Sequence, residues 1–525
     1  MIAVDQLSLW DLIEWRAGLT PEGLFAVDED GRELHFGSYR DACLRVAAAL
    51  QARGVGAESP VAWMLPTRME ALVLAGGLAR LGAVQIPLVP ILRQREVGFI
   101  LAQTGARHFV VPGTWRGFDY PGLAALVIAE LTARGEPTAE RAARGEPDAP
   151  VEVIVADPDL PAGDPAGLVP WEAPVTDPVR WMFYTSGTTA NPKGTRHTDG
   201  TVGAIAYRLN GRFEMTPADR NGLVFPVAHI GGISWLMGGL MAGYGQILIE
   251  AFQPETSCVV LRRHGVTVAG SGPAFWMAYV AEQRRNPGQK LFPDLRALVG
   301  GGASKPPTIN DEVRDVLGVV LATGYGSSEC PGLAHSGVSD SEEVRRSDGH
   351  ALDGVEIRII DGDGHPVPSG EEGEITVRGP MLFKGYVDPV DDEGVFDPDG
   401  WFRTGDVGAL DGRGLLTVTG RLKDIIIRKG ETISAKDVED VLYRHAAIAD
   451  VAAIPLPDAE RGELCCAVIV LAPGAAAPTV NELAAHAASH GLAPQKAPER
   501  VEIVPMLPRN TTGKVLKNEL IAQYR

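Results

Sequence analysis

The sequence predicts an α/β fold: a large N-terminal domain of βα-layered sheets with a β-rich subdomain, and a small mobile α+β C-terminal domain. Three observations support this prediction. The chain has 525 residues, more than one hydrophobic core usually serves. Helix-like and strand-like runs alternate over residues 1–130, which is typical of parallel sheets covered by helices. Several later strand-like runs end in glycine-rich turns.

The first elements are short and regular. Apolar residues recur at helical spacing over residues 39–53 and 69–82. Residues 60–65, 84–89 and 107–111 are short apolar runs that indicate buried strands. Because helix-like and strand-like runs alternate, we expect βα units and a largely parallel sheet.

Two segments need separate interpretation. Residues 131–175 are rich in Ala, Pro, Gly and acidic residues, which predicts a surface excursion rather than a core element. Residues 222–249 carry no charge and are long enough to span a membrane. Pro226 and several glycines interrupt that run, however, so we expect a buried core segment there.

Glycine turns follow three strand-like runs in the middle of the chain. The runs 266–268, 297–299 and 319–321 precede Gly270, Gly300 and Gly324. Ligands of open α/β sheets bind at the carboxyl ends of strands. These strand ends are therefore expected to line one cleft.

The last third of the chain changes character twice. Residues 354–420 contain short strand-like runs separated by Asp-Gly turns, which predicts an antiparallel β region. The residues after 420 have the pattern of a small α+β unit. We therefore expect two domains, 1–420 and 421–525.

Composition restricts the partners and the compartment. The chain has 48 Lys and Arg against 67 Asp and Glu, a formal net charge of −19. This excess disfavours nucleic acid as a partner, because its phosphates would be repelled. Five cysteines without a CxxC pair favour a reducing, cytoplasmic setting over a disulfide scaffold or zinc site. The N-terminus lacks the pattern of a secretory signal, and the sequence leaves open whether the chain forms homo-oligomers.

Residues 184–194, Tyr-Thr-Ser-Gly-Thr-Thr-Ala-Asn-Pro-Lys-Gly, form the most informative motif. Serine and threonine hydroxyls and backbone N–H groups on such a turn can surround phosphate oxygens, and Lys193 adds positive charge. No Gly-Lys-Ser/Thr tripeptide follows the glycines, so the segment is not a Walker loop.

The string resembles the phosphate loop of the AMP-forming, adenylate-forming superfamily, which includes acyl-CoA synthetases, luciferases and peptide-synthetase adenylation domains. The resemblance extends from about residue 35 to residue 520, with further motifs in the family's order. It implies that ATP is bound by Thr185, Ser186, Gly187, Thr188, Thr189 and Lys193. Ala190 stands where the family usually has glycine, and alanine would strain a backbone that needs a positive φ.

Residues 324–329, Gly-Tyr-Gly-Ser-Ser-Glu, resemble the family's adenine and metal segment. A tyrosine between glycines can offer its face to a purine, and a carboxylate oxygen can hold Mg²⁺. The resemblance assigns the adenine to Tyr325, and Mg²⁺ to Glu329 together with Thr185. It also implies nucleotide contacts for Gly324, Gly326 and Ser328.

Two further segments complete the implied nucleotide site. Asp406 matches the aspartate whose carboxylate accepts both ribose hydroxyls, and Arg421 matches the arginine beside it. The family's glycine-rich wall between the adenine and acyl sites corresponds to Gly300, Gly301, Gly302 and Ala303.

The C-terminal unit carries the implied catalytic lysine. Residues 508–514, Pro-Arg-Asn-Thr-Thr-Gly-Lys, resemble the family's lysine motif. On a glycine turn in a mobile domain, the Lys514 ammonium can enter a cleft and neutralise charge that grows on the α-phosphate. Lys423 matches the hinge about which that domain would rotate. The loop that faces CoA corresponds to Arg428, Lys429, Gly430 and Glu431.

Residues 226–232 resemble the segment that bears an active-site histidine or aromatic residue beside the acyl and thioester channel. The resemblance makes His229 catalytic, and the acyl pocket would be lined by His229, Gly232, Trp235 and Gly300. A hydrogen-bonded core histidine and plain packing of Trp235 are the structural alternatives. Aryl-acid enzymes of peptide synthetases commonly place asparagine where His229 stands, which favours the CoA ligases.

Together these motifs predict an ATP-dependent acyl-CoA synthetase that uses Mg²⁺ and CoA. The acid is expected to be aliphatic, alicyclic or aromatic, because no cation for a second charged group is evident near the acyl segment. One alternative is an enzyme that loads the phosphopantetheine of a carrier protein. The other is a non-catalytic protein that binds nucleotide.

Overall fold

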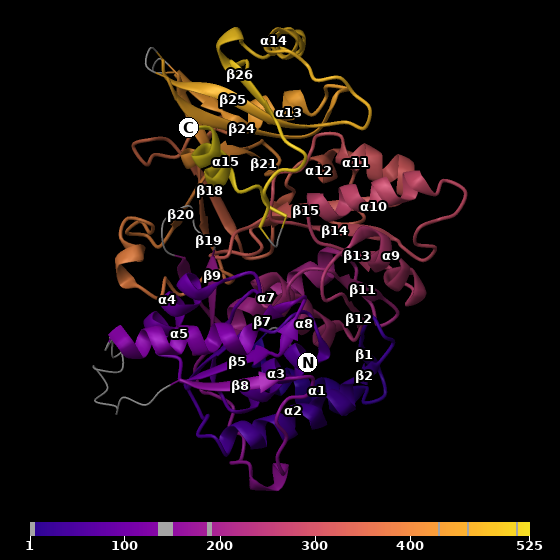
Figure 1. Ribbon diagram of the computed structural model, residues 1–525, viewed down its shortest axis with the longest axis vertical. Coiled ribbons are helices and arrows are strands. Elements are labelled where there is room, and N and C mark those ends of the chain that lie inside the picture. Colours follow the sequence, from indigo (N-terminus) through magenta and orange to yellow (C-terminus); the bar gives the residue numbers. More distant parts are fainter. Residues whose placement is uncertain (1–5, 135–150, 186–191, 429–430, 459–460, 511–512) are drawn as a thin grey trace.

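A computed structural model describes residues 6–134, 151–185, 192–428, 431–458, 461–510 and 513–525. Helices and sheets alternate in layers through the N-terminal part, and the C-terminal residues form a separate sheet at one end of the molecule (Figure 1). The predicted α/β class is confirmed.

One parallel sheet comes from the first 200 residues. Its strands, in spatial order, are β10 (Lys193–Thr198), β9 (Val179–Thr185), β4 (Val84–Pro87), β3 (Pro60–Trp63), β5 (His108–Pro112) and β8 (Glu152–Ala156). Only β10 runs antiparallel to its neighbour, because it follows β9 directly in the chain and pairs with it.

A second sheet joins the middle of the chain to its beginning. Its order is β17 (His350–Ala351), β16 (Ala334–His335), β15 (Val320–Tyr325), β14 (Ala297–Gly301), β13 (Val268–Ala269), β11 (Arg220–Leu223), β12 (Gly245–Leu248), β1 (Leu24–Val27) and β2 (Glu33–His35). The strands from β15 to β1 are parallel, so the glycine-rich ends of β13, β14 and β15 meet at one edge, as predicted.

Helices fill the layers beside these sheets. They are α1 (Leu9–Leu19), α2 (Phe36–Gln51), α3 (Met69–Arg80), α4 (Gln94–Thr104), α5 (Tyr120–Arg134), α7 (Asp199–Arg212), α8 (Ile230–Ala242), α9 (Pro254–Arg263), α10 (Pro273–Arg285), α11 (Ile309–Glu312) and α12 (Glu342–Arg346). Strand β3 shows how the layers arise, because successive side chains of a strand point to opposite faces. Val61 and Trp63 join the core built by α1, α2, α3 and α8, whereas Ala62 joins the core with α4 and α5.

The second sheet is covered on both faces in the same way. In β14, Leu298 belongs to the core that includes Trp276 of α10. Its neighbours Ala297 and Val299 point to the other face, where they pack with Trp235 of α8. The face that carries Trp235 is therefore also the face beneath the glycine strand ends.

Two antiparallel regions follow. The first is a four-stranded sheet of β18 (Glu356–Ile360), β19 (Gly373–Arg378), β20 (Phe402–Leu410) and β21 (Leu416–Arg421). The second contains β22 (Ile425–Arg428), β23 (Glu431–Ser434), β24 (Ile448–Asp458) and β25 (Gly462–Leu471), with helices α13 (Ala435–Leu442), α14 (Val480–Ser489) and α15 (Lys517–Tyr524). Strand β26 (Arg500–Ile503) extends this second sheet and is parallel to β25. The antiparallel and α+β expectations hold, and the domain boundary between residues 420 and 421 stays a prediction.

The expectation that residues 131–175 form only a surface excursion is wrong for part of that range. Strand β8 (Glu152–Ala156) pairs in parallel with β5 at the edge of the six-stranded sheet, and Ile154 and Ala156 are buried. The acidic, proline-rich average composition hid a β-branched run, Val153–Val155, that is long enough for an edge strand.

The long uncharged run 222–249 folds as predicted. It supplies the end of β11, helix α8 and strand β12, and most of its residues are buried in the central core. Among the residues that the structure describes, no helix combines the length and the apolar character needed to cross a membrane.

A buried arginine fixes α8 against the first helix. Arg16 of α1 is only 5% exposed, and its guanidinium donates to the carbonyls of Leu240 and Met241, each at 2.6 Å. These carbonyls belong to the last turn of α8, where helical carbonyls lack partners within the helix. Arg16 therefore satisfies that helix end with a favourable positive charge.

We predict that Arg16→Met lowers the stability of the protein by about 2–4 kcal/mol, since two buried carbonyls lose charge-assisted donors. The apparent melting temperature should fall by several degrees. Arg40→Met is the matched control, because Arg40 forms a partly exposed pair with Asp41 and should contribute no more than about 0.5 kcal/mol. Equal melting temperatures for the two variants would contradict this role of Arg16.

Candidate active site

The phosphate-loop motif lies between two paired strands. Strand β9 ends at Thr185, β10 begins at Lys193, and these two residues are cross-strand partners. The connecting residues 186–191 lie outside the described ranges, as does the side chain of Thr185. The contacts expected of Thr185, Ser186, Gly187, Thr188 and Thr189 therefore stay predictions.

Tyr386 contacts both Lys193, the cation of this motif, and Glu329, the carboxylate expected to bind the metal. Its hydroxyl donates to Oε1 of Glu329 at 2.8 Å, and its ring centroid lies 5.1 Å from Nζ of Lys193. Lys193 also forms an ion pair with Asp391 at 2.7 Å. Two residues 136 positions apart in the sequence thus meet through one tyrosine, since Lys193 and Glu329 both contact Tyr386.

The expected adenine and ribose residues form a compact hydrogen-bonded group. The hydroxyl of Tyr325 donates to Oδ2 of Asp406 at 2.5 Å, and Nε of Arg421 lies 2.6 Å from Oδ1. Asp406 and Arg421 are cross-strand partners in β20 and β21, so the pairing register holds them on one face. Burial, and then the neighbouring carboxylate, raise the pKa of Tyr325 well above its usual value. Tyr325 is therefore a neutral donor.

Lys514 is partly buried and interacts electrostatically with this group. Burial, and then the positive charge of Arg421, lower the pKa of Lys514 to about 8, while Asp424 and Asp406 act in the opposite direction. The side chain of Asn510 accepts from the Lys514 backbone N–H at 2.9 Å and so closes the turn. Lys514 thus reaches the implied ribose site even though 107 residues separate it from Asp406 in the chain.

The glycine before Lys514 sets the contact between the C-terminal unit and the large unit. Gly513 has a φ of +84°, which strains other residues, and a Cβ there would lie 3.1 Å from Cβ of Ala274 in α10. The lysine turn therefore docks closely against the first turn of α10.

The expected hinge and CoA loop lie at the start of the C-terminal sheet. Lys423 is in a single 3₁₀ turn, Leu422–Asp424, between β21 and β22, and its side chain is outside the description. Lys429 and Gly430 also lie outside the described residues, as does the side chain of Glu431. Arg428 forms a two-bond fork with Glu499, with distances of 2.9 and 2.8 Å.

His229 makes local contacts at the start of α8. Its Nδ1 accepts the backbone N–H of Gly231 at 3.2 Å, so the ring caps the helix. Burial lowers the pKa of His229 to about 4, which keeps the imidazole neutral near pH 7. The remaining proton is then on Nε2, and this nitrogen is a donor. The structural alternative and the catalytic one both remain compatible with this geometry.

The glycine-rich wall has steric reasons for its sequence. Gly300 has a φ of +132°, and a Cβ there would overlap the carbonyl of Ser271. A Cβ on Gly301 would overlap the carbonyl of Gly324, its partner in β15. Gly302 also has a positive φ, +85°, and Ala303 follows it. Both strand ends can therefore approach each other only as bare backbone.

The remaining acyl-pocket candidates belong to α8. A Cβ on Gly232 would overlap the backbone of Val227, so tight packing of the turn requires this glycine. Trp235 is half-buried, and its ring stacks on Phe213 with centroids 5.8 Å apart.

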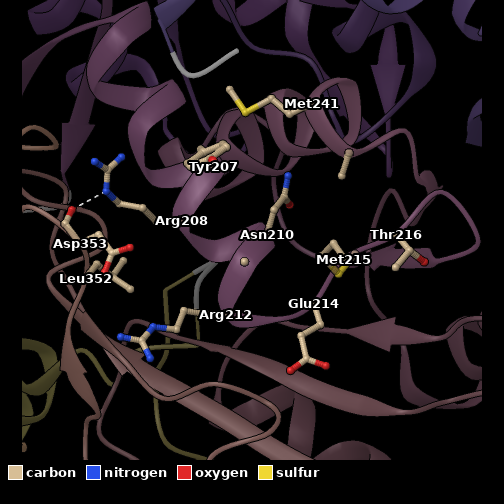
Figure 2. Close-up of a pocket in the computed structure, with 12 residues that line it drawn as sticks. Tyr207, Arg208, Asn210, Arg212, Glu214, Met215, Thr216, Met241, Leu352 and Asp353 are labelled. Atoms are coloured by element: carbon tan, nitrogen blue, oxygen red, sulfur yellow. Dashed lines mark hydrogen bonds between the residues drawn. The ribbon is translucent and has the colours of Figure 1, made fainter. Parts of the chain in front are cut away.

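A cleft of about 760 Å³, here called the outer cleft, is lined by other residues (Figure 2). It is lined by Tyr207, Arg208, Asn210, Gly211, Arg212, Glu214, Met215, Thr216, Met241, Ala242, Leu352 and Asp353. These residues come mainly from the ends of α7 and α8, and none of them belongs to the motifs.

Sequence reasoning missed two residues that shape the site. Tyr386 is one of them, and no motif marked it. The other is His197, which burial keeps neutral by lowering its pKa to about 4. Its Nε2 lies 2.8 Å from the carbonyl of Ser328, so a neutral ring donates there and ties β10 to the segment that bears Glu329. Its position just after the phosphate loop was the only available signal.

Comparison with known proteins agrees with this site. Residues 13–387 match the AMP-binding enzyme family, and residues 437–514 match the AMP-binding enzyme C-terminal domain. The salicyl-AMP ligase / salicyl-S-ArCP synthetase of Mycobacterium tuberculosis is 32% identical over 96% of this chain and 88% of that protein. A feruloyl-CoA synthase from an Amycolatopsis species is 31% identical, covering 97% of each chain. The structure of O-succinylbenzoate coenzyme A synthetase from Bacillus subtilis, with ATP and magnesium ion, gives a TM-score of 0.81 at 27% identity, covering 97% of this chain and 98% of that one.

The chain therefore belongs to the AMP-binding enzyme family, within the adenylate-forming superfamily that its motifs resemble. It is an AMP-forming ligase of the acid–thiol class, and ATP is its nucleotide.

We predict that Asp406→Asn weakens ATP binding at least about tenfold, because a hydrogen bond to a charged group contributes roughly 1.5–3 kcal/mol. The variant should also lose most of the preference for ATP over 3′-deoxyATP that the ribose contact gives the wild type. Calorimetric titration with both nucleotides measures this. Asp399→Asn, an exposed carboxylate of the same β region, is the control and should bind like the wild type. Undiminished ribose discrimination in Asp406→Asn would rule out the assigned contact.

Proposed function

We propose that this ligase is an ATP-dependent acyl-CoA synthetase. It first converts a carboxylic acid and ATP into an acyl-adenylate and pyrophosphate, and then transfers the acyl group to CoA with release of AMP. The observation that carries the proposal is the position of Lys514 beside the Tyr325–Asp406–Arg421 group. A cation at that place can neutralise negative charge that develops next to the ribose.

In the first half-reaction, a carboxylate oxygen attacks the α-phosphorus and the bond to the bridging oxygen of pyrophosphate breaks. Charge grows on the α-phosphate and on the leaving oxygen, and a fixed ammonium in a buried site stabilises it strongly. Lys514 supplies that ammonium, Tyr325 faces the adenine, and Asp406 holds the ribose. Lys193 adds positive charge at the base of the phosphate loop.

Glu329 suits a magnesium ion. A carboxylate provides the hard oxygen ligands that Mg²⁺ prefers, and the Tyr386 hydroxyl orients this one. When bound there, Mg²⁺ would neutralise charge on the phosphates. Thr185 is the second expected ligand, at the end of β9.

In the second half-reaction, the CoA thiolate attacks the carbonyl carbon of the adenylate and the bond to AMP breaks. Lys514 must first leave the site, and the short turn at Lys423 is the natural place for that rotation. Rotation would bring the loop of Arg428, Lys429, Gly430 and Glu431 to the cleft. Arg428 keeps its fork to Glu499 in the present arrangement, which orders the base of that loop.

A carrier-protein ligase is the main alternative. One relative is named for both salicyl-AMP formation and loading of a carrier protein, so the family includes both kinds of thiol acceptor. His229 favours CoA, because aryl-acid enzymes of peptide synthetases commonly have asparagine at this position. The presence of both Lys514 and Glu329 disfavours a non-catalytic nucleotide binder.

An acceptor assay decides between these functions. AMP release with an accepted acid and ATP should rise on addition of CoA and should not require a carrier protein. AMP release that needs a phosphopantetheinylated carrier and ignores CoA would support the alternative. Failure to exchange pyrophosphate into ATP with any acid would support the non-catalytic binder.

Lys514→Met should reduce pyrophosphate exchange by about 10²–10³-fold, since it removes a preorganised charge from the transition state. Thioester formation from a supplied acyl-adenylate should stay nearly normal. Lys496→Met is the control, because this lysine of the same unit pairs with Asp437 away from the cleft. Full-speed pyrophosphate exchange in Lys514→Met would contradict the proposal.

The pH dependence follows from the pKa of Lys514, which is lowered to about 8. The ammonium is charged below that pH and loses its proton above it. Pyrophosphate exchange by the wild type should therefore fall as the pH rises through about 8. In Lys514→Arg, whose side chain stays protonated, the residual activity should persist to higher pH. An unchanged alkaline limb in that variant would assign the titration to another group.

A further inference from the structure

We infer that an aromatic stack of His335, Phe213, Trp235 and Tyr244 closes the bottom of the acyl pocket, so that the enzyme accepts compact acids and rejects long alkyl chains. This inference rests on the proposed function and specifies its substrate class. Compact means a single aromatic or alicyclic ring, or an aliphatic chain of similar length.

The strand register places the stack beneath the glycine wall. In the parallel pair β14 and β15, Val299 is the partner of Ala322, and two residues further on Gly301 is the partner of Gly324. Side chains two residues apart lie on the same face of a strand. Val299 and Ala322 belong to one apolar cluster with Phe213 and Trp235. The aromatic rings therefore lie on the same face as the glycine ends, one step further down the strands.

His335 connects the stack to the wall itself. A Cβ on Gly324 would overlap the His335 ring, so the imidazole lies directly against that strand end. The ring meets Phe213 edge-on, with centroids 4.9 Å apart. Phe213 is 1% exposed and stacks on Trp235 at 5.8 Å. The contacts are continuous from Gly324 to α8.

Trp235 is held in place by a hydrogen bond to its backbone carbonyl and by a second ring contact, with Tyr244. Its carbonyl accepts from Nε2 of Gln246 at 2.7 Å, and its ring meets Tyr244 edge-on at 6.2 Å. Tyr244 is fully buried. The stack is thus supported by the core behind it and cannot yield easily to a longer ligand.

This arrangement limits the depth of the pocket. The pair Val299–Ala322, which packs with the aromatic rings, lies two residues below the glycine ends of β14 and β15. Two residues along a parallel strand span about 6.6 Å, and this depth matches one ring or a few methylene groups. An apolar pocket discriminates by about 10–200-fold for each methylene that does not fit. Acids that extend well beyond that depth should therefore be poor substrates.

The outer cleft lies beyond the stack. Met215 lines this cleft and also packs against the cluster that contains Phe213 and Trp235 (Figure 2). Removal of the Trp235 ring would shift the floor of the acyl pocket toward the outer cleft. Phe213 is a poorer target for substitution, because it is more deeply buried than Trp235.

The test compares Trp235→Ala with the wild type on benzoate, cyclohexanecarboxylate and hexanoate against decanoate and dodecanoate, by pyrophosphate release. The wild type should prefer its best compact acid over dodecanoate by at least about tenfold in kcat/KM. Trp235→Ala should raise kcat/KM for decanoate relative to that compact acid at least about tenfold. Trp235→Phe keeps an aromatic floor and should restore most of the length discrimination that Trp235→Ala loses. Tyr207→Ala, at an exposed residue of the outer cleft, should leave the ratio unchanged.

Each outcome bears on the inference. A wild type with the same kcat/KM for dodecanoate as for its best compact acid overturns it, and so does a folded Trp235→Ala with an unchanged ratio. Trp235→Leu, which keeps apolar packing, replaces the alanine variant if that variant does not fold. Activity with compact acids but no length discrimination overturns this inference alone. No pyrophosphate release with any acid overturns the proposed function, and this inference with it.

Discussion

The candidate site depends on one buried carboxylate. Asp406 is 3% exposed, and it accepts Tyr325 from β15 on one oxygen and pairs with Arg421 from β21 on the other. A buried charge without partners is expensive, so these contacts are needed for the fold as well as for the ligand. The same charge helps to keep Lys514 protonated against the desolvation that lowers its pKa. The nine-stranded sheet, the four-stranded sheet and the C-terminal lysine turn are thereby coupled at one point.

The proposed function requires the C-terminal domain to serve two steps. Lys514 is stabilised in the cleft by Asp406 and Asp424 and destabilised by burial and by Arg421. These opposing contributions act on the protonation of the ammonium. In the proposed function, Lys514 would leave the site after pyrophosphate has departed, and the short turn at Lys423 would absorb the rotation.

Much of the fold and part of the site could be predicted, because local pattern and motif determine them. The alternation of helix-like and strand-like runs in the sequence predicted β3, β4 and β5. The strand-like runs that end in glycine predicted the sheet edge formed by β13, β14 and β15. Strand β8 was missed, because an edge strand needs only a few β-branched residues and its neighbours are acidic and proline-rich. Tyr386 was missed for a different reason. It gains its role only by lying between Lys193 and Glu329, which are remote from it in sequence.

The sequence by itself determined the family and the chemistry of its motifs, because hydroxyls, glycines, carboxylates and lysines at fixed spacing carry information that is independent of packing. Only the tertiary structure decided which of them meet. It placed Lys514 at Asp406, made His229 a neutral helix cap, and packed Trp235 against Phe213. The physical reason is that burial, pKa and ring stacking depend on long-range contacts, which the order of residues in the chain does not specify.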